Sequence, residues 1–521
     1  MASHMRAPGP RERPPAGRTR TALLAVVLLG VVVRLPFFEV ALRTPLDGDS
    51  AIVGLMAREV AFDLTFWGQP YGSPLDGWVV APFVAVLGSS PLAVRLPYLL
   101  LSLALIPLAF ALASELRPAA ALPAAFLLAC PPGYLLLLAA LPPPLYPTTL
   151  VLLGGVLLGA LRFALRGDQG HLPRTGLVLW GLAAGLALWT HLMSAVTVCG
   201  ALAFLFWRTA GARGRLVWAV APLLAVGSAA WGRLLVDPRG LEVVRVAGDG
   251  GGALWRHALE LLPRLHLPLL GLLGGRVPYT AGEPDKHVAL PALAAVLLSL
   301  CYVVVLLVSL RRGRRQPGFL LLAAVVLLVV AVFPFPLRSG PETVRFLTPA
   351  ALPLAVLAAA LPASSRRAWL LVLGLATLHL WPAAALLRAW KRPDTELVPS
   401  CAPVLRLLEA RGVKHAWASY NSSYCLTYAS DGRVVASQPW NERFPGYPLP
   451  LRDEVRVARN VAWVLMPGAD FRLPTPERFE AWLEATGVDD WSADELDRLR
   501  RFLDDRRRAE LAGNTDETVD G

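Results

Sequence analysis

The chain has 521 residues, 55% of them hydrophobic, and its 50 Lys and Arg against 38 Asp and Glu give a net charge of +12. A composition this apolar excludes an ordinary soluble protein and predicts an all-α polytopic membrane protein. The positive charge would suggest nucleic acid in a soluble chain. Here the arginines gather in short loops between apolar runs, so we expect no nucleic-acid partner.

Residues 1–20 are rich in Arg and Pro and precede the first apolar run. The opening MASHM is typical of an expression-tag remnant, and no small-residue cleavage site follows the apolar run. We therefore interpret residues 1–20 as a tag and a cytosolic tail, and we expect a membrane domain over residues 21–390.

Apolar runs recur throughout this expected membrane domain. A crossing helix needs about 20 mostly apolar residues. Eleven candidate runs can be traced: 20–38, 91–114, 118–136, 147–165, 176–190, 192–208, 216–236, 288–310, 318–337, 346–362 and 367–389. The runs 176–190 and 192–208 meet at Trp189–His191 with almost no turn, so they could instead form a re-entrant pair or one kinked span.

The charge of the connections predicts the orientation of the chain. With the N-terminus in the cytosol, every connection on the cytosolic side is biased toward Arg, as the positive-inside pattern requires. These arginines are Arg117, Arg162, Arg166, Arg174, Arg208, Arg213, Arg215, Arg311, Arg312, Arg314, Arg315, Arg366 and Arg367. The longer connections 39–90 and 237–287 then lie outside. An odd number of spans also places the tail from Lys391 outside.

Two apolar stretches in the outer connections are not expected to cross. The stretch 77–88 is too short, and polar side chains interrupt 252–272. We interpret both as interfacial segments that cover the outer leaflet.

An acidic cluster in the first outer loop, 39–90, is the main candidate site. Asp47, Asp49, Asp63 and Asp76 lie close together in a chain whose front half is otherwise poor in carboxylates. Asp49 directly precedes the helical run SAIVGLMAREVAF, so its carboxylate is expected either to cap that helix or to face the space above it. Asp76 also suits a turn, and Asp63 a solvated helix end.

Outer-side cations accompany these acids. A carboxylate can take the proton of an acceptor hydroxyl while Arg forks neutralise a leaving phosphate. Arg34 and Arg95 lie near the ends of the first two long spans, where a charge needs a partner, and Asp47 or Asp49 is the expected one. They could equally pair and snorkel without a catalytic role.

Later cations are also candidates for the phosphate. Arg345 begins a span in GPETVRFLTPA, while Arg276 and Lys286 flank GGRVPYTAGEPDK, which we expect to be mobile and able to close over a donor. Arg338 lies on the same side. Each could instead only anchor its helix to lipid headgroups.

The tail 391–521 has a different pattern. Helical and strand-like segments alternate from residue 397, which predicts a small α/β domain, followed by a charged helical segment and a partly disordered end. Cys401 and Cys425 flank one helix–strand unit. If the tail lies outside they could form a disulfide, or they could stay buried thiols that point apart.

Several of these motifs resemble a known superfamily. LDGDSAIVGLMAREVA, WGQPYGSPLDGWVVAPFVAVLG, GLALWTHLM and RFLTPAALPL are similar to bacterial glycosyltransferase family 39 and aminoarabinose-transferase-like proteins, which have the GT-C fold. The resemblance covers most of the membrane part. It implies transfer of a sugar from a polyprenyl-phosphate donor to a lipid, glycan or protein acceptor at the outer face of the bacterial cytoplasmic membrane.

The resemblance also implies roles for single residues. Asp49 matches the essential first-loop acid, Ser50 stands where a second acid is common, and Asp47 could compensate. Arg34 and Arg95 match arginines at the ends of the first two spans. We group the remaining candidates for substrate or phosphate binding as Arg345, Arg276, Lys286, His257, Asp76 and Tyr71.

No cofactor is certain. The second outer loop lacks the acid often found in such enzymes, so no metal is implied. The separated His191, His257, His266 and His287 leave a divalent metal open as a weak alternative.

Other functions remain open at this stage. The donor could carry an amino sugar in place of a neutral hexose. A transporter or lipid flippase is a different class, although no internal repeat supports it. A catalytically inactive GT-C scaffold is the third alternative, because of Ser50 and the acid-free second loop.

Overall fold

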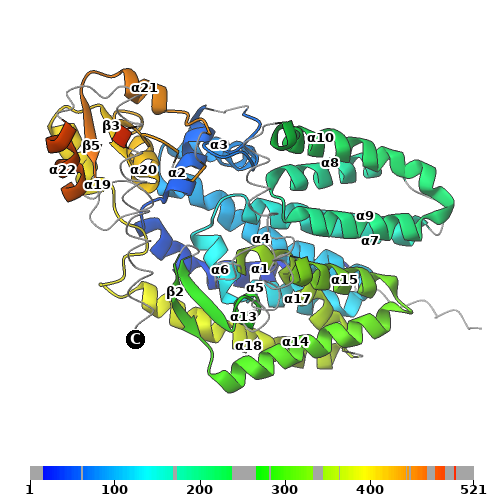
Figure 1. The fold of residues 1–521 in the computed structure, drawn as a ribbon. Coiled ribbons are helices and arrows are strands. Elements are labelled where there is room, and N and C mark those ends of the chain that lie inside the picture. The colour runs from blue at the N-terminus through cyan, green and yellow to red at the C-terminus, as the bar shows by residue number, and fades with distance from the viewer. Residues whose placement is uncertain are drawn as a thin grey trace, which may run out of the picture.

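The computed structural model describes residues 16–59, 63–167, 173–236, 266–280, 283–332, 344–362, 364–441, 443–444, 447–465, 476–486 and 498–499. Helices dominate it (Figure 1). Each of the eleven predicted runs contains a helix. These are α1 (Ala16–Arg43), α4 (Pro91–Leu116), α5 (Ala121–Ala129) with α6 (Gly133–Ala140), α7 (Tyr146–Gly167), α8 (Arg174–Thr190), α9 (Ser194–Arg208), α10 (Val217–Val236), α14 (Ala292–Gly313), α15 (Pro317–Val332), α16 (Val344–Leu347) with α17 (Ala351–Ala360), and α18 (Ser365–Trp390). Short 3₁₀ turns η1 (Pro118–Ala120), η2 (Ala210–Leu216) and η5 (Thr348–Ala350) join some of them.

The lengths of these helices identify a membrane protein. Five of them, α1, α4, α7, α14 and α18, are long and apolar enough to cross a membrane, and the bent pair α5–α6 would make a sixth among the described residues. Helices α9 and α15 and the segment Val344–Ala360 are apolar but shorter. The count of eleven spans therefore stays a prediction.

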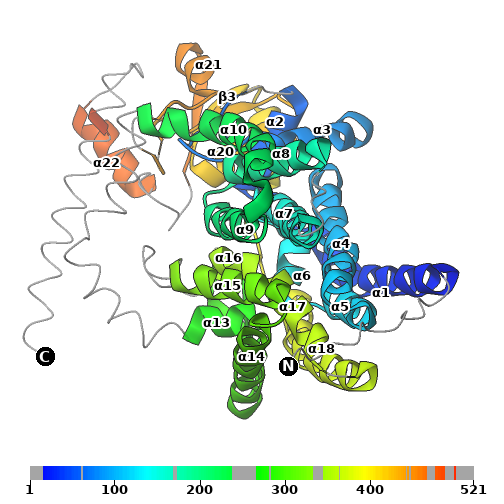
Figure 2. The same cartoon turned by 90° about the vertical axis from the view of Figure 1, so that its right-hand side faces the viewer.

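Two of the predicted runs are interrupted. The run 118–136 bends by 63° between α5 and α6, where Pro131 and Pro132 cannot continue the helical ladder. The junction at Trp189–His191 separates α8 from α9, and both helices pack against α7. Figure 2 shows α7, α8, α9 and α10 grouped on one side of the molecule, away from α14 and α18.

The acidic loop between α1 and α4 contains two helices, α2 (Gly48–Glu59) and α3 (Leu75–Leu87). They pack against each other, and α3 also packs against α4. Their buried side chains share a hydrophobic cluster with Tyr424 and Tyr428 from the tail. The core beneath the acidic loop thus joins two parts of the chain that are far apart in sequence.

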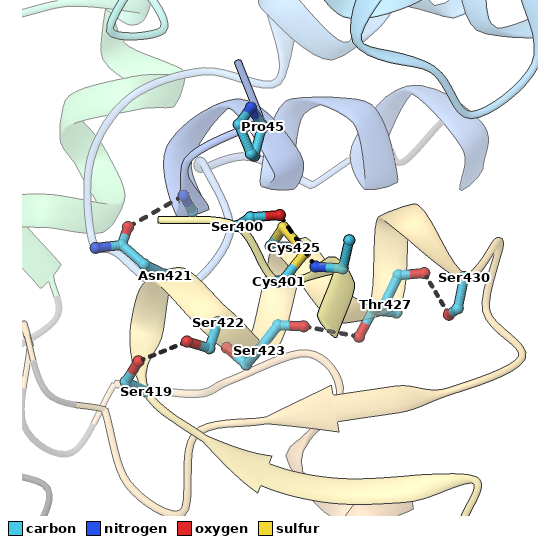
Figure 3. The surroundings of a disulfide bond; sticks show 12 residues. Pro45, Ser400, Cys401, Ser419, Asn421, Ser422, Ser423, Cys425, Thr427 and Ser430 are labelled. Carbon is cyan, nitrogen blue, oxygen red and sulfur yellow. Dashed lines mark hydrogen bonds between the residues drawn. A yellow bond between two sulfur atoms is a disulfide. The ribbon is translucent and has the colours of Figure 1, made fainter. Parts of the chain in front are cut away.

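The tail contains the helices and strands that its pattern predicts. These are α19 (Ala402–Ala410), β3 (His415–Ala418), α20 (Tyr420–Ala429), β4 (Val435–Ser437), β5 (Val461–Val464) and α22 (Pro476–Thr486). The short helix α21 (Arg452–Val457) was not predicted. The three strands form a parallel sheet in the order β4-β3-β5. We call residues 402–464 the C-terminal unit. Cys401 and Cys425 form a disulfide that ties the start of α19 to α20 (Figure 3).

The predicted mobile segment between the later spans is instead largely a β-hairpin. Strands β1 (Arg276–Thr280) and β2 (Glu283–Ala289) pair antiparallel and follow the short helix α13 (His266–Leu272). The prediction missed them because Gly and Pro in GGRVPYTAGEPDK were interpreted as loop signals only. Of the expected surface helix 252–272, only α13 lies within the described residues. His257 and Arg338 lie outside them.

Candidate active site

Asp47, and not Asp49, is the N-cap residue of helix α2 in the acidic loop. The Asp47 Oδ1 accepts a hydrogen bond from the Ser50 backbone N–H at 2.7 Å, and the Asp47 carbonyl accepts from the Ala51 N–H at 2.9 Å. This is the geometry of an N-cap residue. Burial raises the pKa of Asp47, and the charge of Asp49 raises it further. Asp47 is thus engaged in starting α2, which leaves Asp49 as the acid that faces away from the helix end.

Asp49 lies in the first turn of α2 and is bound by two residues of the C-terminal unit. Its Oδ1 accepts hydrogen bonds from Arg443 Nη1 at 2.8 Å and from the Tyr420 hydroxyl. Arg443 Nη1 also donates to the Tyr420 hydroxyl at 2.8 Å, and the guanidinium lies 4.8 Å from the centre of the Tyr420 ring. The side chains of Arg443 and Asp49 are 36% and 31% exposed, so the pair lies at the edge of the protein interior and within reach of a substrate.

No local sequence pattern indicates these two partners. Arg443 is 394 positions from Asp49, in the turn-rich stretch NERFPGYP, and Tyr420 begins an ordinary helix. The sequence predicts Asp47 or Asp49 as the partner of Arg34 and Arg95, because a charge near the end of a span needs a partner. Only the docking of the tail on α2 reveals the actual contact.

Glycines permit this docking. A Cβ at Gly48 would lie 2.9 Å from Tyr420, and one at Gly54 would lie 2.4 Å from the Tyr428 ring. The Gly48 N–H donates to Asn421 Oδ1 at 3.1 Å (Figure 3). Helix α2 therefore approaches α20 closely because these positions lack a side chain.

Tyr71, also in the first loop, brings the cations and the acid together. Burial raises the pKa of its phenol, Arg443 and Arg345 lower it, and Asp49 raises it. Three charged side chains therefore act on one phenol. Its ring packs edge-on against Phe444 at 5.5 Å between ring centres. Tyr71 thus packs beside the Arg443–Phe444 segment and lies within the electrostatic influence of Asp49 and Arg345.

Arg345 lies above an aromatic cluster formed by Phe346, Tyr146 and His191. Its guanidinium is 4.9 Å from the centre of the Phe346 ring, and its buried Nε has no hydrogen-bond partner among the described residues. The rings of Tyr146 and His191 lie 4.9 Å apart and each packs near Phe346. The Tyr134 hydroxyl is likewise buried without a partner in the described part of the chain. Unpartnered buried donors of this kind call for an acceptor.

His191 is a neutral member of this cluster. Burial lowers its pKa to about 4, and the charge of Arg345 acts in the same direction. Its Nδ1 accepts from the Met193 N–H at 3.1 Å, so in the neutral ring the proton lies on Nε2. His191 can therefore donate one hydrogen bond without adding charge.

Arg34 does not lie free to bind phosphate. It is 1% exposed, and its guanidinium donates to Ser102 Oγ at 2.9 Å, to the Leu128 carbonyl at 3.0 Å and to the Ala129 carbonyl at 3.2 Å. It also donates to Gly30 O in its own helix at 3.1 Å. Arg34 thus satisfies the open carbonyls at the C-terminus of α5, which is a structural task.

Arg95 has the same kind of environment. It is 2% exposed and donates to the carbonyls of Ala41, of Thr44 at 2.6 Å and of Pro45 at 2.7 Å. These carbonyls belong to the end of α1 and the chain just after it. The expected ion pairs of Arg34 and Arg95 with Asp47 or Asp49 are not found among the described contacts.

Asp76 and Asp63 also have structural partners. Asp76 is fully buried in the first turn of α3 and accepts from the Tyr98 hydroxyl at 2.7 Å and the Leu145 N–H at 2.6 Å. It thereby holds Leu145 at φ 76°, a backbone conformation unusual for leucine. Asp63 accepts from Trp67 Nε1 at 2.6 Å.

The cations of the β-hairpin lie in a different environment. Arg276 Nη2 is 3.1 Å from His287 Nδ1, and Lys286 and His287 line a cavity of about 340 Å³ next to Arg392 and Glu396. No described contact joins this cavity to Asp49. Within the described residues no three His, Cys, Asp or Glu are grouped to hold a metal ion.

Comparisons with known proteins give a fold. No family model and no curated protein matches the chain. It is similar to the apo crystal structure of the Archaeoglobus fulgidus oligosaccharyltransferase, with 14% identity over 81% of this chain and 64% of that one and a TM-score of 0.50. For the same enzyme tethered to an acceptor peptide with the NVT sequon, the identity is 12% over 85% of this chain and 67% of that one, and the TM-score is 0.50. For ArnT from Cupriavidus metallidurans bound to undecaprenyl phosphate, the identity is 17% over 80% of this chain and 76% of that one, and the TM-score is 0.47.

These likenesses define the class of fold. The chain spans about two thirds of the length of the archaeal enzyme, and the identities are too low to carry over any residue role. The chain therefore shares the fold of the archaeal oligosaccharyltransferase, and its assignment to a family stays a prediction.

Proposed function

We propose that the protein is a polyprenyl-phosphate-dependent glycosyltransferase of the cytoplasmic membrane, with family 39 and aminoarabinose-transferase-like enzymes as its relatives. In this proposal residues 21–390 form the membrane domain with eleven spans. The acidic loop and residues 391–521 lie on the extracytoplasmic face. The observations that carry the proposal are the Asp49 carboxylate held by Arg443 and Tyr420, and the Arg345 guanidinium whose buried Nε has no acceptor among the described residues.

The residues at this place suit the chemistry of sugar transfer. The carboxylate of Asp49 takes the proton of an acceptor hydroxyl, whose oxygen attacks the anomeric carbon of the donor. The bond from that carbon to the phosphate oxygen breaks, and the polyprenyl phosphate leaves with the bonding electrons. Arg345 stabilises the charge that develops on the leaving phosphate.

The unpartnered donors support a phosphate at Arg345. Its buried Nε and the Tyr134 hydroxyl both lack an acceptor among the described residues. Leaving a buried donor without a partner costs about 1–3 kcal/mol per group. A phosphate offers several strong acceptor oxygens and would remove this cost.

An inactive scaffold is the second candidate. Asp49 is already bound by Arg443 and Tyr420, and Ser50 occupies the position where related enzymes often have a second acid. A scaffold would need neither a free carboxylate oxygen nor a donor site. Activity measurements separate the two candidates.

The first experiment asks whether the lipid phosphate binds. We expect native mass spectrometry of the purified protein to detect a polyprenyl phosphate, and added undecaprenyl phosphate to bind. Arg345→Ala should weaken that binding about tenfold, the loss of one charge-assisted contact. Arg345→Lys should weaken it similarly, because a point charge cannot replace the fork. Equal binding by the parent and both variants would make Arg345 a lipid anchor only.

The second experiment asks whether Asp49 is the base. With polyprenyl-phosphate sugars offered as donors to native lipid extracts, Asp49→Asn should abolish transfer while leaving lipid-phosphate binding unchanged. Asp63→Asn is the matched control, because Asp63 lies in the same loop and bonds Trp67. Transfer that survives in Asp49→Asn rejects the assignment.

The third experiment tests the proposed extracytoplasmic position of residues 391–521. A reporter that works only in the cytosol, fused after Gly521, should be silent.

A further inference from the structure

Two residues of the C-terminal unit hold one oxygen of the Asp49 carboxylate. Arg443 and Tyr420 both donate to Oδ1, while Oδ2 has no hydrogen bond among the described residues. A carboxylate that is free at both oxygens can rotate about its Cβ–Cγ bond. A carboxylate whose Oδ1 is bound by two donors has a defined orientation. Its Oδ2 then points in a fixed direction and can accept a hydrogen bond from a substrate.

We propose that Arg443 and Tyr420 are positioning residues that hold the Asp49 carboxylate in one orientation, so that Oδ2 is available to the acceptor hydroxyl. The inference rests on the proposed function in which Asp49 is the base. It makes the C-terminal unit part of the active site, because neither donor comes from the helices of residues 16–390 that carry the rest of it.

The donors are themselves held in place. The Arg443 guanidinium lies over the rings of Tyr420 and Phe444, 4.8 and 5.9 Å from their centres. Burial and the charge of Asp49 raise the pKa of Tyr420 well above its ordinary value, so the phenol stays a donor. Asn421, the next residue of α20, binds the Gly48 N–H and fixes the helix against the loop. The orientation of Asp49 is therefore set by packing on both sides.

Arg443 is the cation in direct contact with Asp49 among the described residues. The Tyr420 hydroxyl is the second donor to the same oxygen, and Asp47, two residues earlier, is within the influence of Arg95. Removing Arg443 should therefore leave the Asp49 carboxylate with Tyr420 as its remaining donor and without a fixed ion pair.

Carbodiimide labelling tests the proposal without a known substrate, because a carboxylate held by a guanidinium and a phenol should react with the reagent more slowly than one without these donors. The full-length protein is labelled in detergent at about pH 6, and fragment-ion mass spectrometry separates Asp49 from Asp47. Arg443→Ala should raise the labelling of Asp49 about fivefold, in the range for a partly exposed pair. Arg443→Lys should restore much of the protection, and Tyr420→Phe should give a smaller rise than Arg443→Ala.

Matched controls come from the same unit. Arg433→Ala removes a guanidinium that pairs with Glu409, and Tyr428→Phe removes a phenol that reaches the Ser90 carbonyl. Both should label Asp49 like the parent. Equal labelling of Asp49 in the parent and in Arg443→Ala overturns the proposal. So does a rise in Arg443→Ala that Asp63 shares, since this would report loss of the fold.

Binding of undecaprenyl phosphate distinguishes positioning from direct contact with the donor. Arg443→Ala should bind the lipid phosphate like the parent, whereas Arg345→Ala should not. If Arg443→Ala weakens binding as strongly as Arg345→Ala, Arg443 is a phosphate ligand and the positioning role is wrong. If the parent does not bind at all, the proposed function fails, and the labelling still shows whether Arg443 holds Asp49.

Discussion

The arginines in the long helices and the arginine at the acidic loop are stabilised in different ways. Arg34 and Arg95 are almost fully buried and donate mainly to backbone carbonyls at or near helix C-termini. Arg443 is about a third exposed and pairs with a carboxylate. Charge inside the helical part is therefore used to close the ends of broken or terminating helices. Charge at the loop is placed where it can act on a substrate.

The difference follows from what each site must satisfy. The last carbonyls of a helix lack intrahelical donors and carry partial negative charge. Within a membrane no water replaces those donors, so an Arg fork that reaches several carbonyls is well suited. Near the surface water can solvate helix ends, and a carboxylate becomes the better partner for a guanidinium that must stay oriented.

The largest effect is expected from removing such a buried fork. Arg34→Met keeps the length and apolar packing of the side chain but leaves the carbonyls of Leu128 and Ala129 without their donor. We expect a loss of about 3–5 kcal/mol in the free energy of unfolding, since one partner of a buried polar network is lost. Thermal unfolding in detergent measures it.

The control for Arg34 is an arginine at the surface. Arg174 lies at the exposed start of α8, 5.4 Å from the Trp218 ring centre. Arg174→Met should change the free energy of unfolding by less than about 1 kcal/mol. A similar loss in both variants would mean that burial of the fork at α5 is not what stabilises the helical part.

The second prediction concerns the C-terminal unit. The Cys401–Cys425 disulfide closes a loop with a sequence separation of 24 residues. Removing it by Cys401→Ser together with Cys425→Ser should cost about 3 kcal/mol in the stability of that unit. Hydrogen exchange of α20 should report the loss. Cys199→Ser, at an exposed free thiol, is the control and should leave the exchange unchanged.

The sequence predicted the elements better than their contacts. Apolar periodicity placed a helix in every predicted run, and the tail pattern gave β3, α20, β4 and β5, because these depend on local residue type. The motifs also predicted the GT-C fold. The hairpin β1–β2 was missed because Gly and Pro are compatible with a turn as well as with a loop.

The partners of the site residues could not be predicted, because they depend on long-range packing. Asp49 was identified as a candidate from its place at the start of a helical run, but its bond to Arg443 spans 394 positions. Arg34 and Arg95 were interpreted as phosphate ligands because backbone carbonyls are not visible as partners in a sequence. The roles of Arg345, Arg276 and Lys286 remain predictions.

The third prediction uses the pH dependence of the aromatic cluster. The pKa of His191 falls from its ordinary value near 6.5 to about 4 on folding, so the unfolded chain binds more protons in that interval. Stability should therefore decrease as the pH falls from 6.5 to 4, by up to about 3 kcal/mol. His191→Gln should flatten this part of the curve. An unchanged curve would show that other groups cause the acid sensitivity.

The smallest effect is expected at the other ion pair between the first loop and the C-terminal unit. Arg58 Nη1 lies 3.4 Å from Asp431 Oδ1, with side chains 30% and 63% exposed. Ser89 donates to the same oxygen at 2.8 Å and is the main cause of the lowered pKa of Asp431, with Arg58 contributing less. Because the pKa of Asp431 is lowered in the folded state, its contacts stabilise the fold above the ordinary pKa of Asp. This stability is lost as the pH falls through the folded pKa.

Because the pair is solvated, a double-mutant cycle with Arg58→Ala and Asp431→Ala should give a coupling of less than about 0.5 kcal/mol that vanishes in high salt. A large coupling that persists in high salt would contradict this. It would mean that the greater exposure of the Arg58–Asp431 pair does not make it weaker than the Arg443–Asp49 pair.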